Sequence, residues 1–246
     1  MPLNLKLPKH KGLFVTGTDT GVGKTIIAGS VARILSESGL SAGVFKPIAT
    51  GCRDSWEGLV SSDTEFLAWC ANADVDLAVI TPVGYRTPAA PIVSAAVERT
   101  PPDFEKIAAA YRKIAGQTDA VIVEGIGGAR VPLTAEFDVL DLACEFALDV
   151  VIVARADLGT INHTLMTIDC VRSANLTVAG VVINKYNAAG ASVAEETCGR
   201  VIEQCGRTEI LAVVPFDDQV SIEEQRMAES VLETVRECDW RKLLRL

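Results

Sequence analysis

Two lysines, a threonine and two carboxylates stand at positions that suit the handling of phosphate groups. Lys24 and Thr25 close the segment VTGTDTGVGKT, residues 15–25, in which small residues lead into a Gly-Lys-Thr triplet. The backbone N–H groups of such a loop can point at a polyphosphate, while the lysine reaches its terminal phosphates and the threonine hydroxyl ligates Mg²⁺. The strict pattern places glycine at position 18, where this chain has Thr18 after Gly17. An ordinary turn containing Gly-Lys-Thr is the alternative.

The flanking segments are those that a phosphate-binding loop requires. Residues 12–15, GLFV, have the composition of a buried strand, and residues 26–35 are apolar at helical spacing, with the pattern carried to Gly39. A helix that starts at the loop adds the partial positive charge of its N-terminus to the site. The strand–loop–helix context therefore favours a phosphate loop over a chance turn.

Short hydrophobic runs alternate with helical stretches along the rest of the chain. The predicted strands are residues 13–16, 42–46, 120–124, 150–154, 179–184 and 210–214. The further predicted helices are residues 103–115, 139–148, 162–174, 193–205 and 221–238. The strands are hydrophobic almost throughout, which indicates an α/β fold with a mostly parallel sheet and helices on both faces. Residues 82–102, with five prolines, are predicted to form a surface loop. We expect a single domain over residues 1–246, with residues 1–11 as an N-terminal extension.

Charged residues end two of these predicted strands, and ligands of open parallel sheets bind at the carboxyl ends of strands. Lys46 ends the second predicted strand, where an ammonium can neutralise a phosphoryl group or an oxyanion. Glu124 follows four hydrophobic residues, the Walker-B arrangement, and the glycines after it allow close approach of the backbone to a ligand. Asp63 lies in a Ser-Ser-Asp-Thr-Glu cluster and is either part of a helix start or a metal ligand. Thr25, Asp63 and Glu124 together would form a set of Mg²⁺ ligands. The alternative for Lys46 and Glu124 is that they are solvated charges at strand ends.

Asn184 and Lys185 end the fifth predicted strand. They match the first two residues of the Asn-Lys-x-Asp motif by which GTPases recognise guanine, but position 187 is Asn rather than Asp. We interpret Asn184 as a contact to adenine.

Composition limits the cellular compartments and the classes of binding partner that suit this chain. The net charge of −9 argues against nucleic acid or an anionic membrane as the main partner. There is no long apolar run that suggests a membrane span, and the N-terminus lacks a signal-peptide core. Seven cysteines are scattered singly without a Cys-x-x-Cys pair, which is typical of reduced thiols. These features predict a cytoplasmic protein.

Five segments, taken in order, resemble the dethiobiotin synthetase family. They are residues 17–25, Lys46-Pro47 with Thr50-Gly51, Ser62-Asp63, residues 124–128 and the Leu-Gly-Thr-Ile-Asn-His segment 158–163. The resemblance as a whole runs from residue 12 to residue 216. The Thr-Asp-Thr core of the loop and the 158–163 segment are more specific than a general phosphate loop. The resemblance implies a cytoplasmic, homodimeric ATP- and Mg²⁺-dependent ligase of biotin synthesis.

The implied reaction joins 7,8-diaminononanoate and CO₂ into the cyclic urea of dethiobiotin, giving ADP and phosphate. One amine takes up CO₂ as a carbamate, and ATP phosphorylates the carbamate to a carbamic-phosphate anhydride. The second amine then displaces phosphate and closes the ring.

The resemblance also implies roles for individual residues. Lys46 and Lys24 would be catalytic, and the metal would be held by Thr25, Asp63 and Glu124. The residues expected at ATP are Thr20, Gly21, Val22, Gly23, Lys24, Thr25, Ile26, Asp63, Glu124, Gly125, Ile126, Gly127, Asn184, Lys185, Val214, Pro215 and Phe216. The substrate would meet Thr50, and its distant carboxylate would meet Gly159, Thr160, Ile161 and Asn162 of the partner subunit.

Three positions depart from patterns within the family. Gly21 stands where some members have Glu, Thr50 stands where many have Ser, and Lys185 replaces an acid seen in some members. The last departure bears on nucleotide preference.

Three other classes use the same kind of loop. A switch ATPase of the partition and division-site type carries a signature lysine at the position of Asp19, so its defining residue is missing here. A small-molecule kinase would use the loop without a pocket for a diamine. Amide ligases of the cobyrinic-acid type usually attach a glutamine-hydrolysing domain, for which this chain has no room.

Overall fold

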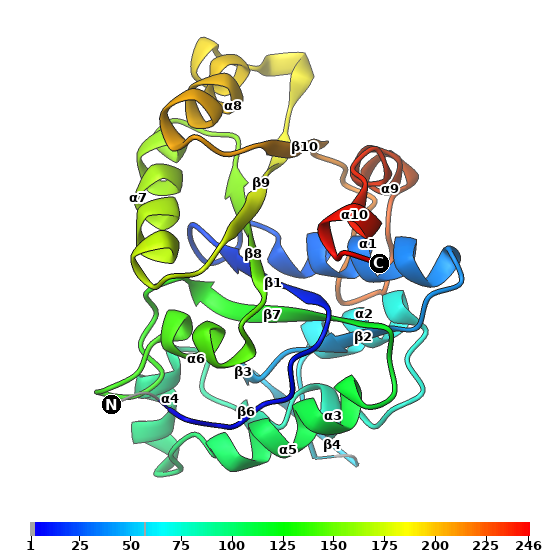
Figure 1. Ribbon diagram of the computed structural model, residues 1–246, viewed down its shortest axis with the longest axis vertical. Helices are drawn as coiled ribbons and strands as arrows, with labels where there is room; N and C mark the ends of the chain where they lie inside the picture. The colour runs from blue at the N-terminus through cyan, green and yellow to red at the C-terminus, as the bar shows by residue number, and fades with distance from the viewer. Residues whose placement is uncertain (1–2, 57) are drawn as a thin grey trace.

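A six-stranded sheet forms the centre of the computed structural model, which describes residues 3–56 and 58–246 (Figure 1). The strand order is β10-β9-β8-β1-β7-β2, and every pairing is parallel. The strands are β1 (Gly12–Gly17), β2 (Ala42–Phe45), β7 (Ala120–Gly128), β8 (Asp149–Arg155), β9 (Val178–Tyr186) and β10 (Ile210–Pro215). The predicted α/β class is confirmed, and each of the six predicted strands is present.

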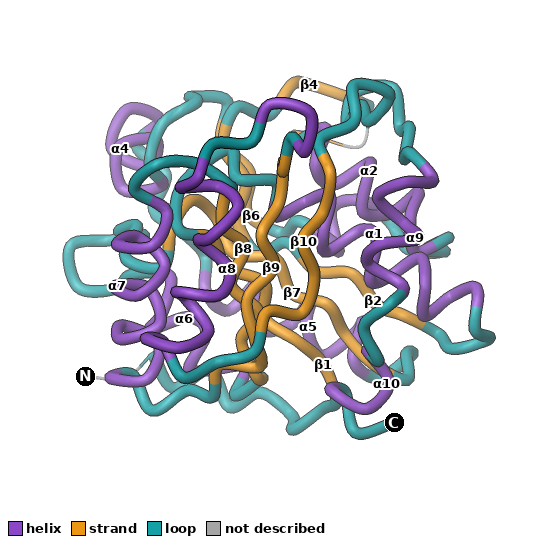
Figure 2. The backbone as a smooth tube through the Cα atoms, turned by 90° about the horizontal axis from the view of Figure 1, so that it is seen from above, coloured by secondary structure: helices purple, strands orange, loops and turns teal. Residues whose placement is uncertain are grey.

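Helices cover both faces of this sheet (Figure 2). One face packs against α5 (Phe104–Ala115), α6 (Val139–Phe146), α7 (Thr160–Ser173) and α8 (Val193–Gly206). The other packs against α1 (Lys24–Glu37), α2 (Ser62–Ala71), α9 (Glu229–Arg236) and α10 (Trp240–Leu243). Successive strand residues alternate between the two cores, since Phe14 faces the first and Leu13 and Val15 the second. This double burial explains why the strands are hydrophobic at every position.

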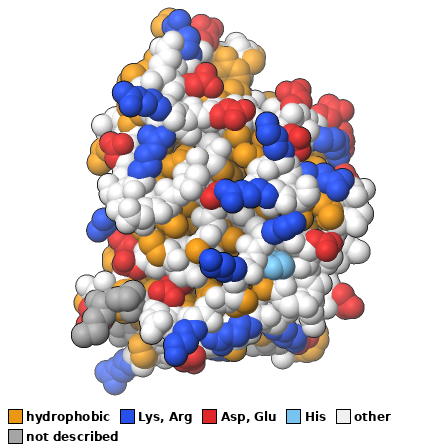
Figure 3. All heavy atoms as spheres, in the orientation of Figure 1, with side chains coloured by type: hydrophobic (Ala, Val, Ile, Leu, Met, Phe, Trp, Pro, Cys, Tyr) orange, Lys and Arg blue, Asp and Glu red, His pale blue; other side chains and the backbone are white. Residues whose placement is uncertain are grey.

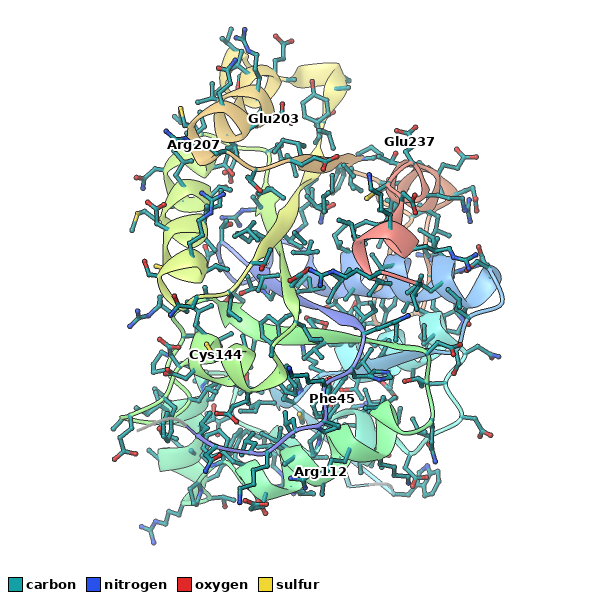
Figure 4. The ribbon with its side chains drawn as sticks, in the orientation of Figure 1. Phe45, Arg112, Cys144, Glu203, Arg207 and Glu237 are labelled. Carbon is teal, nitrogen blue, oxygen red and sulfur yellow. The ribbon has the colours of Figure 1, made fainter. Side chains whose placement is uncertain are left out.

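An aromatic cluster fills the core beneath α5 and α6. Tyr111 and Phe146 have ring centroids 4.8 Å apart, and the ring centroid of Phe45 lies 5.7 and 5.9 Å from theirs. Phe45, at the end of β2, is labelled in Figure 4. The same helices hold the N-terminal segment. The N–H groups of Asn4 and Leu5 donate to the Glu145 carboxylate at 2.8 and 2.6 Å, and Leu5 is buried.

The prediction of a surface loop over residues 82–102 is wrong. This stretch holds β6 (Val83–Tyr85), which pairs in parallel with β3 (Ile48–Thr50), and the helix α4 (Pro91–Glu98). Pro91 occupies the first turn of α4, where its fixed φ suits a helix and its missing N–H has no partner to lose. A cluster of prolines therefore marked the boundaries of short elements.

The predicted helix 221–238 is also wrong over its first half, because only Glu229–Arg236 is helical. The preceding turn is closed by two backbone hydrogen bonds between Ser221 and Arg226, at 3.0 and 2.8 Å, and Ala228 is the N-cap of α9. Six further described elements lie outside the predicted set: the hairpin β4 (Arg53–Ser55) and β5 (Gly58–Val60), the helices α2, α3 (Leu77–Ile80) and α10, and the 3₁₀ turn η1 (Ala188–Gly190).

The surface is mixed in charge, and acidic and basic side chains are interspersed over the face drawn in Figure 3. Among the described residues, no helix is both long enough and apolar enough to cross a bilayer. The seven cysteines are free thiols, and three of them, Cys52, Cys70 and Cys198, are buried.

Candidate active site

The phosphate loop spans residues 18–23, between β1 and α1. It is anchored at its start by the Thr18 N–H, which donates to the Val153 carbonyl of β8 at 3.0 Å. Gly21 and Gly23 have φ of +74° and +95°, the left-handed region that favours glycine. At Gly23 a Cβ atom would also overlap the side-chain amide of Asn184. The loop therefore requires glycine at position 23 for two independent reasons.

Lys24, the first residue of α1, folds back over the loop. Its Nζ atom donates to the Asp19 carbonyl oxygen at 3.0 Å. Burial lowers the pKa of Lys24 to about 8, although the nearby Glu124 carboxylate works in the opposite direction. Among the described residues no carboxylate is in direct contact with this ammonium, which is therefore placed to receive an anionic ligand.

Lys46 lies at the centre of a buried ionic cluster. Its Nζ atom contacts Glu124 Oε1 at 2.8 Å and Asp63 Oδ2 at 2.9 Å. The Thr25 hydroxyl donates to the same Glu124 oxygen at 2.8 Å. The side chains of Lys46 and Glu124 are 4% and 1% exposed, whereas that of Asp63 is 36% exposed. The structure thus joins four residues that the sequence placed at separate strand and helix ends.

The pKa directions in this cluster follow from burial and from the three charges. Burial raises the pKa of Glu124, and contact with Lys46 offsets this only in part. Burial works against the ammonium of Lys46, but the two carboxylates outweigh it and raise the pKa of that lysine. For Asp63 burial would raise the pKa, yet the Lys46 ammonium prevails and lowers it. Lys46 is therefore held as a cation between its two acidic partners.

Asp63 is free for this role because another residue caps its helix. The Ser61 side chain accepts the Thr64 N–H at 3.1 Å, so Ser61 is the N-cap of α2. Asp63 lies in the first turn and projects toward Lys46 instead of capping the helix. The alternative interpretation of Asp63 as a helix cap is therefore wrong, because Ser61 is the cap.

The glycines after Glu124 form an irregular end of β7. The register between β1 and β7 shifts after Glu124, and Gly127 has a φ of +61°. A Cβ atom at Gly125 would meet the ring of Phe14 at 3.1 Å, so this glycine serves packing. Ile126 and Gly127 line the site instead.

These groups surround a cavity of about 380 Å³, here called the phosphate cavity. Its walls come from the phosphate loop, the ionic cluster and the ends of β3 and β7, and they are Thr20, Gly21, Gly23, Lys24, Thr25, Ile26, Lys46, Thr50, Asp63, Glu124, Ile126, Gly127, Lys185 and Ile222. Most of the residues predicted to contact polyphosphate, metal and substrate amine therefore share one cavity.

A second cavity of about 270 Å³, here called the base cavity, adjoins the end of β10. Its walls are Ile26, Asn184, Lys185, Pro215, Phe216, Asp217, Val220, Ser221, Ile222, Glu223 and Val231. Val214, which was expected at ATP, is fully buried and is not among these walls. Asn184, the expected adenine contact, uses Nδ2 to donate to the Val22 carbonyl at 2.9 Å.

The segment from Gly159 to Asn162 lies at the start of α7, with Gly159 as N-cap at a φ of +97°. These four residues line neither the phosphate cavity nor the base cavity. Within one chain the structure therefore does not bring the predicted carboxylate-binding turn to the ionic cluster.

Ile222 is the main residue that sequence reasoning missed. It lines both cavities, from the irregular segment that was expected to be helical. Asp217 and Glu223 were also missed. No periodicity marks these positions, and the only available signal was their distance of a few residues from the end of a predicted strand.

Comparisons with known proteins agree with this geometry. A family model described as an AAA domain matches residues 11–224. The ATP-dependent dethiobiotin synthetase of Thermodesulfovibrio yellowstonii is 36% identical over 212 residues, covering 83% of this chain and 88% of the relative. That of Methanocaldococcus jannaschii is 35% identical over 219 residues, covering 87% and 99%. That of Anaeromyxobacter dehalogenans strain 2CP-1 reaches 41% identity over 175 residues, covering 71% and 77%.

Solved structures with similar folds come from more distant proteins. The MinC:MinD cell division protein complex of Aquifex aeolicus gives a TM-score of 0.58 at 14% identity, covering 92% of this chain and 95% of that one. A ParA family ATPase of Chlorobium tepidum gives 0.53 at 14% identity, covering 93% and 97%. At this identity the likeness extends to the phosphate-loop ATPase fold alone. By sequence the chain belongs to the family of ATP-dependent dethiobiotin synthetases and is an ATP-dependent ligase.

Proposed function

We propose that this chain closes the ureido ring of dethiobiotin from 7,8-diaminononanoate and CO₂, using ATP and Mg²⁺ and releasing ADP and phosphate. The observation that carries the proposal is the position of Lys46. Its buried ammonium shares one cavity with the phosphate loop, two carboxylates and the Thr50 side chain. A small-molecule kinase needs the phosphate loop and the two carboxylates. The additional Lys46 ammonium, placed where a second substrate would lie, suits a reaction that passes through an anionic carbamate.

ATP fits the two adjoining cavities as an extended ligand. The base would enter the base cavity beside Pro215 and Phe216, with Asn184 in its wall. The polyphosphate would lie along Thr20 and the N–H groups of residues 21–26, with Lys24 at the terminal phosphates. The left-handed glycines of the loop support this placement, because they direct backbone N–H groups toward a common centre.

Thr25, Asp63 and Glu124 are suited to hold Mg²⁺ with the nucleotide. The observation that supports this fit is Glu124 Oε2, a buried carboxylate oxygen that has no hydrogen-bond partner among the described residues. A hydroxyl and few carboxylates, completed by water and phosphate oxygens, are the ligands that Mg²⁺ takes in nucleotide sites. When bound, the metal would neutralise charge on the phosphates.

Lys46 and Lys24 would act on the reacting groups. A substrate amine adds to CO₂ and loses a proton, giving a carbamate whose oxygen attacks the γ-phosphorus while ADP leaves. The second amine then attacks the carbonyl carbon, and the departing phosphate takes the bonding electron pair as the ring closes. Lys46 would stabilise the carbamate oxygens and Lys24 the γ-phosphoryl oxygens, where negative charge is concentrated. Thr50 would hold the diamine by its hydroxyl.

The working unit in this proposal is a cytoplasmic homodimer of single-domain chains. The turn from Gly159 to Asn162 would bind the substrate's carboxylate in the partner's site, since the N-terminus of α7 is suited to an anion. The turn lines neither cavity of its own chain, so this role requires a second chain.

One assay tests the reaction. The protein is incubated with 7,8-diaminononanoate, bicarbonate, ATP and Mg²⁺, and dethiobiotin is sought by mass spectrometry. Lys46→Gln should bind nucleotide normally and lose roughly 10²–10³-fold in turnover, because it removes a preorganised donor. The exposed Lys113 provides a matched control, and Lys113→Gln should retain full activity. ATP turnover that needs no diamine and rises with DNA or lipid would favour the switch ATPase, and a phosphorylated product without ring closure would favour the kinase.

A further inference from the structure

Lys185 occupies a β-bulge at the end of β9. The register between β9 and β10 shifts between Val213 and Pro215, so Lys185 and the residue before it oppose a single residue of β10. Lys185 itself has a φ of +61°, a left-handed conformation that non-glycine residues rarely adopt. Bulges of this kind re-aim side chains beside functional sites.

The bulge brings two consecutive side chains to the phosphate loop. Lys185 Nζ donates to the Gly21 carbonyl at 2.8 Å, and Asn184 Nδ2 donates to the Val22 carbonyl at 2.9 Å. Successive side chains of a regular strand point to opposite faces of the sheet. Without the bulge only one of the two would reach the loop.

Lys185 also lies where the two cavities meet. Within the part of the chain that the structure describes, Ile26, Lys185 and Ile222 are the residues that line both the phosphate cavity and the base cavity. Two of the three are apolar, so the Lys185 ammonium is the charged group at this junction, and it is exposed. A nucleotide with its base in one cavity and its terminal phosphates in the other passes its ribose and α-phosphate through the junction.

We propose that Lys185 binds the α-phosphate of the nucleotide, exchanging the Gly21 carbonyl for a phosphate oxygen when the nucleotide enters. This inference rests on the placement of the nucleotide in the proposed function. An anionic oxygen is the stronger acceptor, since charge-assisted hydrogen bonds are about twice as strong as neutral ones. Gly21 has no side chain, and the position of its missing Cβ is open. Lys24 would hold the far end of the phosphate chain and Lys185 the near end.

The variant Lys185→Asn tests the inference, because Asn tolerates a left-handed φ and carries no charge. Steady-state assays should give a KM for ATP raised about tenfold with kcat unchanged, since binding lost equally in ground and transition states appears in KM alone. Inhibition by ADP and by AMP should weaken by the same factor, while inhibition by adenosine stays as in the parent protein. Lys185→Arg keeps the charge and should restore most of the affinity.

Arg207→Asn is the matched control. Arg207 is a basic residue with a φ of +47° at the end of α8, on the face of the sheet opposite α1 (Figure 4). This variant should leave the KM for ATP unchanged.

Three results would overturn the assignment of Lys185: a normal KM in Lys185→Asn, an equal loss of adenosine inhibition, or a fall in kcat with AMP inhibition intact. The last would show that Lys185 only braces the loop. A parent protein that makes no dethiobiotin contradicts the proposed function instead, and nucleotide inhibition can then be replaced by direct calorimetry of ADP and AMP.

Discussion

Replacing Lys46 by Met should destabilise the ligand-free protein by about 3–5 kcal/mol, the usual result of removing one partner from a buried ion pair. The variant leaves Glu124, whose side chain is 1% exposed, as a carboxylate with a hydrogen bond from Thr25 and no cation in contact. Asp63 contributes less to this loss, because its side chain is 36% exposed and water can replace the lysine. For a chain of this size the expected fall in Tm is roughly 6–20 °C.

The loss should depend on pH in a defined direction. Burial already raises the pKa of Glu124, and without Lys46 nothing charged nearby opposes that shift as strongly. A carboxyl with a raised pKa binds a proton more readily in the folded than in the unfolded state. Its destabilising effect is therefore complete above the raised pKa and fades as the pH falls toward the unfolded value of about 4.3, by up to about 1.4 kcal/mol per pH unit.

Thermal unfolding in EDTA from pH 5 to pH 8.5 provides the measurement. The double variant Lys46→Met/Glu124→Gln should recover most of the lost stability, because it removes the unpaired charge and keeps a group that accepts the Thr25 hydroxyl. Lys113→Met, at an exposed position, should change Tm by little. A Tm for Lys46→Met within 2 °C of the parent (about the change that 1 kcal/mol produces) would refute the reasoning. So would a double variant as unstable as the single one.

Three further predictions concern the loop and the dimer. Because the pKa of Lys24 lies at about 8, binding of ADP at pH 8 in EDTA should take up about half a proton, which calorimetry in buffers of different ionisation enthalpy detects; no uptake would contradict the placement of phosphate at this lysine. Gly23→Ala should weaken ATP binding more than tenfold in a calorimetric titration, since the added Cβ overlaps a neighbour at a backbone φ of +95°. The control Gly39→Ala, where φ is +81° and the Cβ position is open, should leave the ATP affinity unchanged in the same titration. Inactive Gly159→Asp and Lys46→Gln proteins should recover about a quarter of normal activity once their subunits exchange, because half of the dimers are mixed and each mixed dimer holds one intact site. A mixture that stays inactive after exchange is verified by mass would place each site within one chain.

The sequence predicts the strands of the sheet, and it marks the charged residues that the structure then brings together at the strand ends, for a physical reason. Strands buried on both faces must be hydrophobic at nearly every position, so a charged residue such as Lys46 or Glu124 marks a strand end at once. The phosphate loop can be recognised equally well from the sequence, because its backbone conformation requires glycine at particular positions. Both signals are local.

The remaining features depend on contacts that no local pattern records. Asp63 contacts Lys46 because Ser61, and not Asp63, is the N-cap of α2. The sequence offered several residues for that cap and did not show which of them would take it. The direction of the Lys185 side chain follows from the register between β9 and β10, which only tertiary pairing sets. Ile222 reaches the site from a tight turn, where helical periodicity was misleading.

The position of β1 in the sheet has a consequence for how the chain folds during synthesis. β1 (Gly12–Gly17) leaves the ribosome first among the strands, yet its two neighbours are β7, which begins at Ala120, and β8, which begins at Asp149. The loop that follows it is anchored to Val153. A nascent chain that stops short of β8 therefore has no formed phosphate site, so nucleotide can stabilise only chains in which the centre of the sheet has already closed. Until then the hydrophobic β1 segment must be kept from aggregating by other means, such as chaperone binding.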